Sequence, residues 1–289
     1  MQSSTVKLLR FPFSFFLMPV YWFALSQVVH IDWQGAIITF FILHFLLYPA
    51  SNGYNSFMDR DETPVGGLKN PPLPTRQLFQ VTVIMDAAAI ALSLLIDPFF
   101  TGLLILYIAA SRAYSYRGIR LKKFPIAGYL TVVIFQGAVT FLMVYHASQA
   151  NKSIHIPVDI WKAMIASSLL VGGFYPLTQV YQHEADRKDG VTTISMLLGI
   201  RGTFIYAGVL YLLAFVQLAA YFLLSFETAE FLVLATAMVP VLVYFFAWAV
   251  QVWKKPAAAD FKHTMQMNIL ASCCTNLAFI AILLMRQKE

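Results

Sequence analysis

The chain has 289 residues, of which 59% are hydrophobic and only 12% are charged. Since roughly 25% of the residues in a soluble protein are charged, this composition excludes an ordinary soluble enzyme, a disordered chain and a typical nucleic-acid-binding domain. It predicts a polytopic membrane protein, in which the placement of the net charge of +6 matters more than its sum. At about 20 apolar residues per helix, there is room for about eight to ten spans and none for a separate soluble domain.

Apolar stretches along the chain predict nine membrane-spanning helices. Only helices satisfy their own backbone hydrogen bonds in a bilayer, and the short alternating segments of a β-barrel are missing from the sequence. The predicted spans are residues 11–29, 35–50, 79–97, 99–115, 126–147, 159–181, 203–225, 230–252 and 263–285. The second stretch is short, and we expect its helix to continue into the polar segment after it. The predicted fold is all-α, with a single membrane-embedded domain over residues 1–289.

The basic residues predict the orientation of these helices. If the spans alternate in direction, 16 of the 20 Lys and Arg residues fall on the side that holds the N-terminus. Cytoplasmic loops carry such an excess of positive charge. We therefore expect a cytoplasmic N-terminus and a C-terminus on the opposite side. The long polar loops after spans two, four and six then face the cytoplasm, where we expect the active site.

Two acidic motifs follow the second and sixth predicted spans, in the segments 52–76 and 181–199. In each motif an amide and two acids are spaced i, i+4 and i+7, which places them on one face of a helix. The first motif consists of Asn55, Asp59 and Glu62, and the second consists of Gln182, Asp186 and Asp189. Because both motifs follow even-numbered spans, they predict two repeated four-helix halves plus one extra helix.

These motifs are a candidate metal site. Carboxylates gathered near a membrane surface repel one another unless a cation lies between them, and Mg²⁺ usually binds through one or two carboxylates plus substrate phosphates. The candidate ligands are Asn55, Asp59, Glu62, Gln182, Asp186 and Asp189. The alternative is a pair of solvated loops with local ion pairs, such as Asp59 with Arg60. The repeated spacing at equivalent places favours the metal site.

The loop between spans four and five supplies positive charge close to these acids. Arg117, Arg120 and Lys122 follow one another closely, and guanidinium and ammonium groups are suited to diphosphate oxygens. Arg10, at the mouth of the first span, is a fourth candidate. The alternative for all four residues is a basic loop that only determines topology.

The order of the motifs resembles that of the UbiA superfamily of intramembrane prenyltransferases, which carries an NDxxDxxxD motif after its second helix and a DxxxD motif after its sixth. Three further segments are similar to family patterns: Lys69–Pro74 to a KNRPLP-type loop, Tyr114-Ser115 with Leu121-Lys122 to a YS…LK segment, and Gly190–Thr193 with Leu197–Gly199 to a GxxT…LG tail. The resemblance covers the whole chain in helix count and motif order.

The chain departs from the family motifs at three positions. Ser56 and Thr63 stand in place of two acids of the first motif, and Gln182 stands in place of the first acid of the second. Gln182 still offers a carbonyl oxygen to Mg²⁺, and Glu62, beside Thr63, is expected to point in a similar direction. The site therefore carries less charge than the family pattern, so weaker metal binding, a shifted substrate and lost activity all remain open.

The resemblance implies a Mg²⁺-dependent enzyme that transfers an isoprenyl group from a prenyl diphosphate to an aromatic or lipid acceptor inside the membrane. The implied catalytic residues are Asp59, Asp186, Asn55 and Gln182, and the implied diphosphate ligands are Lys122, Arg120, Arg117 and Arg10. A terpene cyclase of the same superfamily is one alternative, in which double bonds of the prenyl chain itself attack the cation. A transporter is another, since repeated halves and polar groups within spans suit it; the clustering of the acids at one face argues against it.

Three further features have a possible role. Asp86 and His44 lie within predicted spans, where ionisable groups are functional candidates by default. A hydrogen bond to a neighbouring helix would explain either of them equally well. The segment 63–75 contains a Gly-Gly pair and could close over a substrate to exclude water, although it could also be a simple connector.

Overall fold

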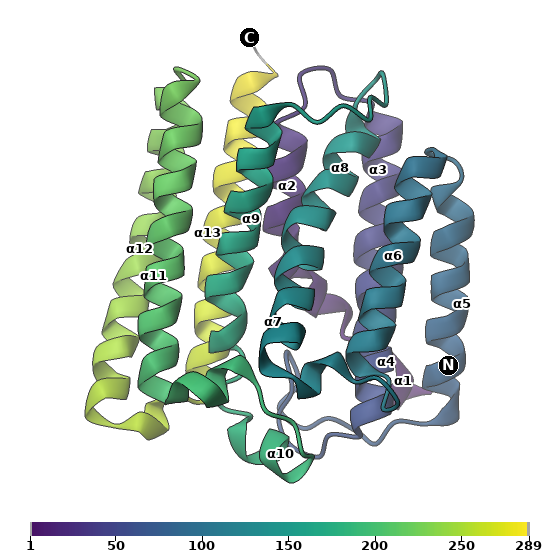
Figure 1. Ribbon diagram of the computed structural model, residues 1–289, viewed down its shortest axis with the longest axis vertical. Coiled ribbons are helices and arrows are strands. Elements are labelled where there is room, and N and C mark those ends of the chain that lie inside the picture. Colours follow the sequence, from purple (N-terminus) through teal and green to yellow (C-terminus); the bar gives the residue numbers. More distant parts are fainter. Residues whose placement is uncertain (1, 288–289) are drawn as a thin grey trace.

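The computed structural model describes residues 2–287, and these form helices joined by loops with two isolated β-bridges (Figure 1). The predicted all-α fold is confirmed. The elements are α1 (Ser3–Leu8), η1 (Phe11–Leu17), α2 (Met18–Ser26), α3 (Trp33–Phe41), η2 (Ile42–Leu47), α4 (Tyr48–Asp59), α5 (Arg76–Ser93), α6 (Pro98–Ser115), η3 (Leu121–Lys123), α7 (Pro125–Val133), η4 (Ile134–Val139), α8 (Thr140–Ser148), α9 (Val158–Leu177), α10 (His183–Lys188), α11 (Ile194–Leu224), α12 (Thr228–Lys254), η5 (Pro256–Ala258) and α13 (Phe261–Arg286).

Seven helical stretches are long and apolar enough to cross a membrane. They are Ser3–Ser26, Trp33–Asp59, Pro125–Ser148, Val158–Leu177, Ile194–Leu224, Thr228–Lys254 and Phe261–Arg286. The helices α5 and α6 occupy the other two predicted spans and stand alongside the rest (Figure 1), but they are not among these seven. Asp86 of α5 and Arg112 of α6 lower the hydropathy of these two helices, and they form an ion pair with each other. The count of nine spans and the two-repeat arrangement stay predictions.

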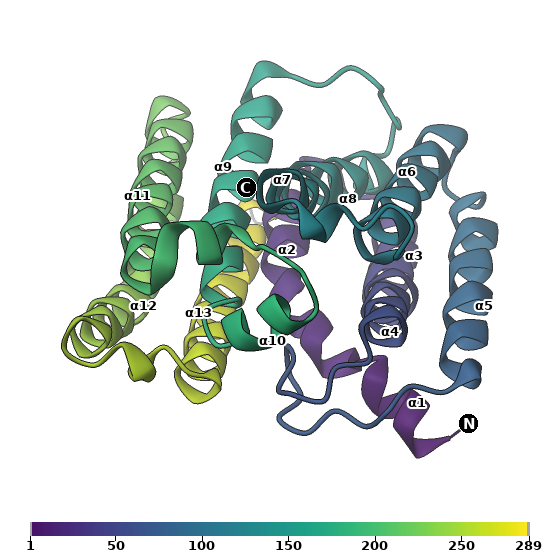
Figure 2. The same cartoon turned by 60° about the horizontal axis from the view of Figure 1, so that its bottom comes forward.

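The loops that carry the sequence motifs gather at one end of the bundle. Figure 2 brings this end forward and shows α1, α10 and the segment between α4 and α5 together there. The C-terminal end of α13 lies at the opposite end (Figure 1). The second helical stretch continues through its polar residues to Asp59, as expected from the sequence.

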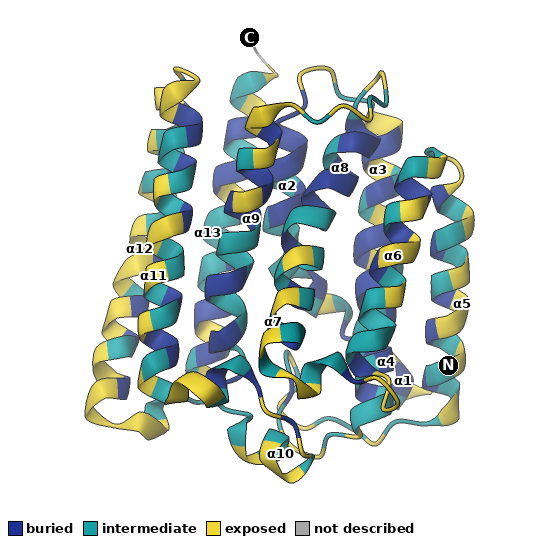
Figure 3. Cartoon of the chain, viewed as in Figure 1, coloured by how far each residue is buried: buried dark blue, intermediate teal, exposed yellow. Residues whose placement is uncertain are grey.

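Apolar side chains face both the interior and the outer surface of the bundle. Figure 3 shows buried residues on the inner faces of the helices and many exposed residues on α11 and α12. Large apolar side chains are among the exposed ones, including Ile205 at 59%, Leu212 at 63% and Phe246 at 61%. Such a surface is unfavourable in water and suited to lipid.

The interior is rich in aromatic residues at the end far from the motif loops. The ring of Phe23 stacks on Phe279 at 4.5 Å between centroids and meets Phe141 edge-on at 5.1 Å. All three side chains are buried to 1% exposure or less. This cluster ties α2, α8 and α13 together, so the helices form one packed body at this end.

Two π-helical segments, η2 and η4, interrupt the helical stretches Trp33–Asp59 and Pro125–Ser148. Such segments release backbone groups from the regular ladder and frequently occur at functional sites. In η4 the freed amide of Ala138 donates to Ser168 Oγ of α9 at 3.1 Å. Gly137 allows this close approach, because a Cβ there would lie 2.6 Å from Ser168 Cα. The widened turn places Gln136 on the wall of the central cavity.

Candidate active site

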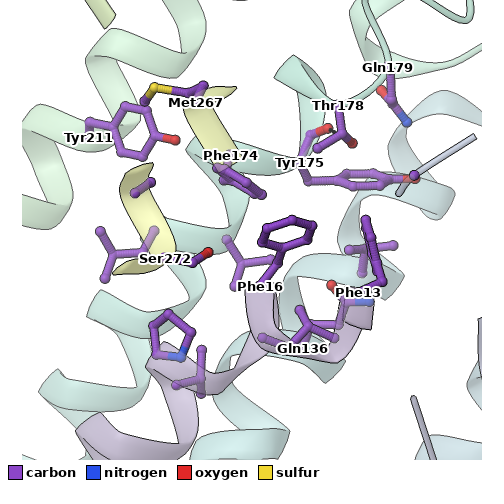
Figure 4. A pocket seen from close by; sticks show the side chains of 18 of the residues that line it. Phe13, Phe16, Gln136, Phe174, Tyr175, Thr178, Gln179, Tyr211, Met267 and Ser272 are labelled. Atoms are coloured by element: carbon purple, nitrogen blue, oxygen red, sulfur yellow. Dashed lines mark hydrogen bonds between the residues drawn. The ribbon is translucent and has the colours of Figure 1, made fainter. Parts of the chain in front are cut away.

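A cavity of about 880 Å³ lies between the helices, and its wall combines a charged end with a long apolar part. The charged residues that line it all belong to the motif-loop end of the bundle: Arg10, Asp59, Asp61, Lys122, Asp186 and Asp189. The remaining wall is uncharged and largely aromatic or aliphatic. Figure 4 shows Phe16 of η1 and Phe174 and Tyr175 of α9 converging on this space. One cavity thus combines a polar mouth with an apolar interior.

The first acidic motif is held rigidly by the end of α4. Asn55 Nδ2 donates to Asp59 Oδ2 at 2.8 Å and to Ser115 Oγ of α6 at 3.1 Å. The Asp59 side chain is only 5% exposed and forms an ion pair with Lys122, with Arg120 Nη2 at 3.7 Å from its other oxygen. Two cations from the α6–α7 loop therefore fix the carboxylate at the edge of the cavity.

The helix ends at Asp59, and this corrects the expectation for Glu62. Arg60 adopts the left-handed conformation, with φ 56° and ψ 44°, and its amide caps the helix by donating to Ser56 O at 3.0 Å. The i+7 position therefore lies beyond the helix and off its face. Glu62 is exposed and does not line the cavity, whereas Asp61 does.

Asp61 is a site residue that the spacing argument did not single out. Burial, together with the charge of Asp59, raises the pKa of Asp61 to about 6. The only signal in the sequence was its position next to the motif. Its orientation depends on a left-handed arginine, a conformation that sequence reasoning assigns chiefly to glycine or asparagine.

The second acidic motif surrounds the short helix α10. Gln182 is its N-cap residue and Asp189 its C-cap residue. The side-chain nitrogen Gln182 Nε2 donates to Pro64 O at 3.3 Å, so the side-chain oxygen of Gln182 stays available as a ligand. Burial, followed by the charges of Asp61, Asp59 and Asp189, raises the pKa of Asp186 to about 7 against the opposing effect of Lys122.

The four basic candidates occupy two kinds of position. Lys122 and Arg10 line the cavity, whereas Arg117 and Arg120 lie behind the acids. Arg120 forms an ion pair with Asp189, and Arg117 Nε donates to Met58 O at 2.7 Å. These two arginines connect the α6–α7 loop to the two acidic segments.

Arg10 connects the cavity to the segment 63–75. Its guanidinium donates to Asn52 O at 3.1 Å and to Gly66 O at 3.3 Å. The ring of Phe13 packs against the same loop, since a Cβ on Gly66 would lie 2.7 Å from it. Arg10 Nε is buried and has no hydrogen-bond partner within residues 2–287. These contacts hold the loop at the polar mouth, and the Arg10 Nε–H remains without an acceptor among the described residues.

The acidic end of the cavity offers oxygen ligands to a divalent cation. Within the described part of the chain, no group of three or more His, Cys, Asp or Glu side chains is assembled as a metal site. The buried oxygen Asp59 Oδ1 nevertheless has no hydrogen-bond partner there, and burial, together with neighbouring acids, raises the pKa values of Asp61 and Asp186. This donor set fits Mg²⁺, which takes oxygen ligands and needs only one or two carboxylates when phosphates complete its shell.

The two ionisable residues within predicted spans lie outside the cavity wall. Asp86 accepts a hydrogen bond from Arg112 Nε at 2.9 Å, and the Arg112 guanidinium lies 4.1 Å from the centroid of the Tyr54 ring. His44, in η2, is buried to 1% exposure among aromatic rings such as that of Tyr48. Asp86 therefore has the helix-bridging role that was one of its two interpretations.

The apolar helices and the polar-mouthed cavity define an integral, multi-pass membrane protein with a site for an amphipathic ligand. The chain matches the sequence profile of the UbiA prenyltransferase family over residues 15–270 and belongs to this family.

A plant enzyme and two archaeal proteins of known structure are similar to this chain. Chloroplastic homogentisate solanesyltransferase of Arabidopsis thaliana is 29% identical over 119 residues, which are 39% of this chain and only 30% of that protein. A UbiA homolog from Archaeoglobus fulgidus, solved with GPP and Mg²⁺, has a TM-score of 0.69 at 18% identity and covers 97% of this chain and 99% of its own. The apo UbiA homolog from Aeropyrum pernix K1 has a TM-score of 0.71 at 18% identity, covering 94% and 98%. The solved structures share the fold.

Proposed function

We propose that the protein catalyses Mg²⁺-dependent transfer of an isoprenyl group from a prenyl diphosphate to an aromatic or lipid acceptor within the membrane. The observation that carries this proposal is the meeting of Asp59, Asp61 and Asp186 with Lys122 at one end of an otherwise apolar cavity. A prenyl diphosphate has the same division into a multiply charged head and a hydrocarbon tail. The fold relative from Archaeoglobus fulgidus, solved with GPP and Mg²⁺, supports the same substrate class.

The acids would hold the metal. Asp59 and Asp186 are the principal ligands in this proposal, with oxygens of Asn55, Gln182 and Asp189 nearby. Glu62 is left out because it is exposed outside the cavity. When bound, Mg²⁺ would supply positive charge that neutralises the diphosphate as it leaves.

The basic residues of the cavity wall would receive the diphosphate. Lys122 already pairs with Asp59, so it can exchange this carboxylate for a phosphate oxygen when the substrate arrives. Arg10 offers its free Nε. The allylic C–O bond then breaks, its electron pair leaves with the diphosphate, and the acceptor attacks the allylic carbon and loses a proton.

The apolar wall would protect the allylic cation. Rings from η1 and α9 surround the space beneath the acids, including those of Phe13, Phe16 and Phe174. Aromatic faces stabilise cations, and their bulk excludes the water that would otherwise quench one. The segment docked on Arg10 would close the mouth on the loop side.

A direct test uses purified protein in detergent with labelled prenyl diphosphates of several lengths, with and without an aromatic acceptor such as homogentisate. We expect a prenylated acceptor and released diphosphate, both dependent on Mg²⁺. A cyclic hydrocarbon formed without acceptor would replace this proposal with the terpene cyclase, and the absence of any diphosphate release would leave the transporter. Unchanged turnover in both Asp59→Ala and Asp186→Ala would show that the site is wrong.

The orientation completes the proposal. The excess of Lys and Arg on the side that holds the N-terminus, 16 of 20 if the spans alternate, supports a cytoplasmic N-terminus and a cytoplasmic mouth of the cavity. Cysteine substitutions in segment 63–75 and labelling with an impermeant reagent in sealed vesicles would test this orientation.

A further inference from the structure

Tyr181 lines the cavity together with the charged residues of its polar mouth, and its hydroxyl is buried. The residue lies in the turn between α9 and α10, immediately before Gln182, and its side chain lines the cavity. Its hydroxyl oxygen is buried and has no hydrogen-bond partner among residues 2–287. A buried polar group without a partner is unfavourable, and native proteins place few such groups. The hydroxyl therefore calls for a partner that the protein itself does not supply.

The surroundings of Tyr181 indicate the kind of partner. A phenol is protonated at neutral pH and can donate a hydrogen bond. Three charged residues act on this hydroxyl: Arg10, Asp186 and Asp61. The same three charged residues line the mouth of the cavity. A group that fits here must accept hydrogen bonds and tolerate both a cation and several acids. A diphosphate accompanied by a divalent cation has these properties.

The ring of Tyr181 is held in a defined orientation. It meets the ring of Phe261, the first residue of α13, edge-on at 5.3 Å between centroids. The backbone beside it is fixed as well, because the backbone N–H of Gln182 donates to Gln179 O at 2.9 Å. The hydroxyl is thus a preorganised donor, and it can bind a ligand with little loss of side-chain freedom.

Tyr211 offers an internal comparison. Its hydroxyl is also buried, unpartnered among the described residues and on the wall of the same cavity. It belongs to α11 and packs edge-on against Phe245 at 5.8 Å, within an apolar cluster. The residues packed around Tyr211 are aromatic or aliphatic, whereas three charged residues act on Tyr181. The two tyrosines therefore differ in whether a phosphate could lie beside them.

We propose that the Tyr181 hydroxyl donates a hydrogen bond to an oxygen of the substrate diphosphate. This inference rests on the proposed function, and it adds a binding residue on the side of the mouth formed by the α9–α10 turn. The phenol is neutral, so it contributes a donor without adding a charge that would compete with Mg²⁺ for the acids. As the C–O bond breaks, negative charge grows on the diphosphate and strengthens this hydrogen bond.

The test measures the inhibition constant of inorganic pyrophosphate in the Mg²⁺-dependent transfer reaction, together with the KM values of both substrates. In Tyr181→Phe we expect pyrophosphate inhibition to weaken by about tenfold, which is the effect of one hydrogen bond to a charged group. The KM of the prenyl diphosphate should rise with it, while the KM of the acceptor should not. In the matched control Tyr211→Phe, the pyrophosphate inhibition constant should equal that of the wild type.

A second variant separates hydrogen bonding from packing. Tyr181→Gln retains a donor but loses the ring that contacts Phe261, and we expect it to weaken pyrophosphate inhibition less than Tyr181→Phe does. The proposal is overturned if pyrophosphate inhibits Tyr181→Phe as strongly as it inhibits the wild type. It is also overturned if pyrophosphate inhibits Tyr181→Gln more weakly than Tyr181→Phe, because the ring alone would then matter. If Asp186→Asn weakens inhibition while Tyr181→Phe does not, the proposed function survives and only this inference fails. If neither the wild type nor any variant catalyses Mg²⁺-dependent prenyl transfer, the proposed function itself fails.

Discussion

The two acidic segments share their spacing but differ in how their charges are balanced. Asp59 in the first segment is paired with Lys122 and lies near Arg120, so its charge is neutralised inside the protein. Asp186 in the second segment has no ion pair among the described residues, and its pKa is raised to about 7 by burial and neighbouring acids. The comparison shows that equal spacing does not give equal surroundings: the carboxylate of Asp59 has an ion-pair partner, whereas that of Asp186 has none among the described residues.

The largest expected effect is common to both segments. Asp59→Asn and Asp186→Asn should each lower turnover by about a hundredfold or more, because each removes a charge that holds the metal and its diphosphate. The measurement is the initial rate of prenyl transfer at saturating Mg²⁺. Glu62→Gln is the matched control, and we expect its rate to be that of the wild type. A comparable loss in Glu62→Gln would contradict the placement of the site.

Stability without metal should separate the two segments. Asp59→Asn should destabilise the metal-free protein by about 3 kcal/mol, because it leaves the partly buried Lys122 without its ion-pair partner, whereas Arg120 keeps Asp189. Thermal unfolding of the detergent-solubilised protein in EDTA would measure this. An unchanged melting temperature would mean that the ion pairs of Asp59 contribute nothing to the fold.

Asp186→Asn should have the opposite and smaller effect. The pKa of Asp186 is raised to about 7, so the folded state is increasingly disfavoured as the pH rises from the ordinary pKa of an aspartate to about 7, and it stays disfavoured at higher pH. We expect the metal-free variant to be more stable than the wild type by about 1–2 kcal/mol at pH 8. The difference should shrink as the pH falls through 7 toward the ordinary value of an aspartate. A variant less stable than the wild type at pH 8 would contradict this view of Asp186.

The smallest effect concerns the loop between the two segments. A Cβ on Gly66 would lie 2.7 Å from the Phe13 ring, so Gly66→Ala should loosen the loop. We expect the KM for the prenyl diphosphate to rise severalfold, a cost of about 1 kcal/mol. Gly102→Ala is the control, since nothing lies within 4 Å of a Cβ there. Equal KM values in the two variants would dissociate the loop from substrate binding.

Much of the helical architecture was predictable from hydropathy. The proximity of Asn55 and Asp59 was predictable from their spacing. The i, i+4 spacing predicts this pair because both residues lie within one helix, as the hydrogen bond between their side chains confirms. The charges that balance Asp59 come from a loop distant in sequence, and no local pattern specifies which arginine reaches it. The site roles of these residues stay predictions until they are tested.

The exchange of Glu62 for Asp61 shows where such reasoning fails. Residue spacing predicts a common face only as long as the helix continues, and α4 ends at Asp59 itself, three residues before Glu62. The left-handed conformation of Arg60 ends the helix, and the sequence does not predict this conformation. Likewise, nothing in the sequence distinguishes Tyr181 from the other tyrosines, because its unpartnered hydroxyl is a property of the assembled site.

The docking of segment 63–75 links ligand binding to the opening of the mouth. Arg10 and Gln182, both proposed to face the ligand, each donate to a carbonyl of this segment, at Gly66 and Pro64. Any ligand that draws on these side chains must change the stability of the docked loop, and by linkage the loop must change the affinity for the ligand by the same factor. We therefore expect the binding and the release of the diphosphate to be coupled to the docking of this loop.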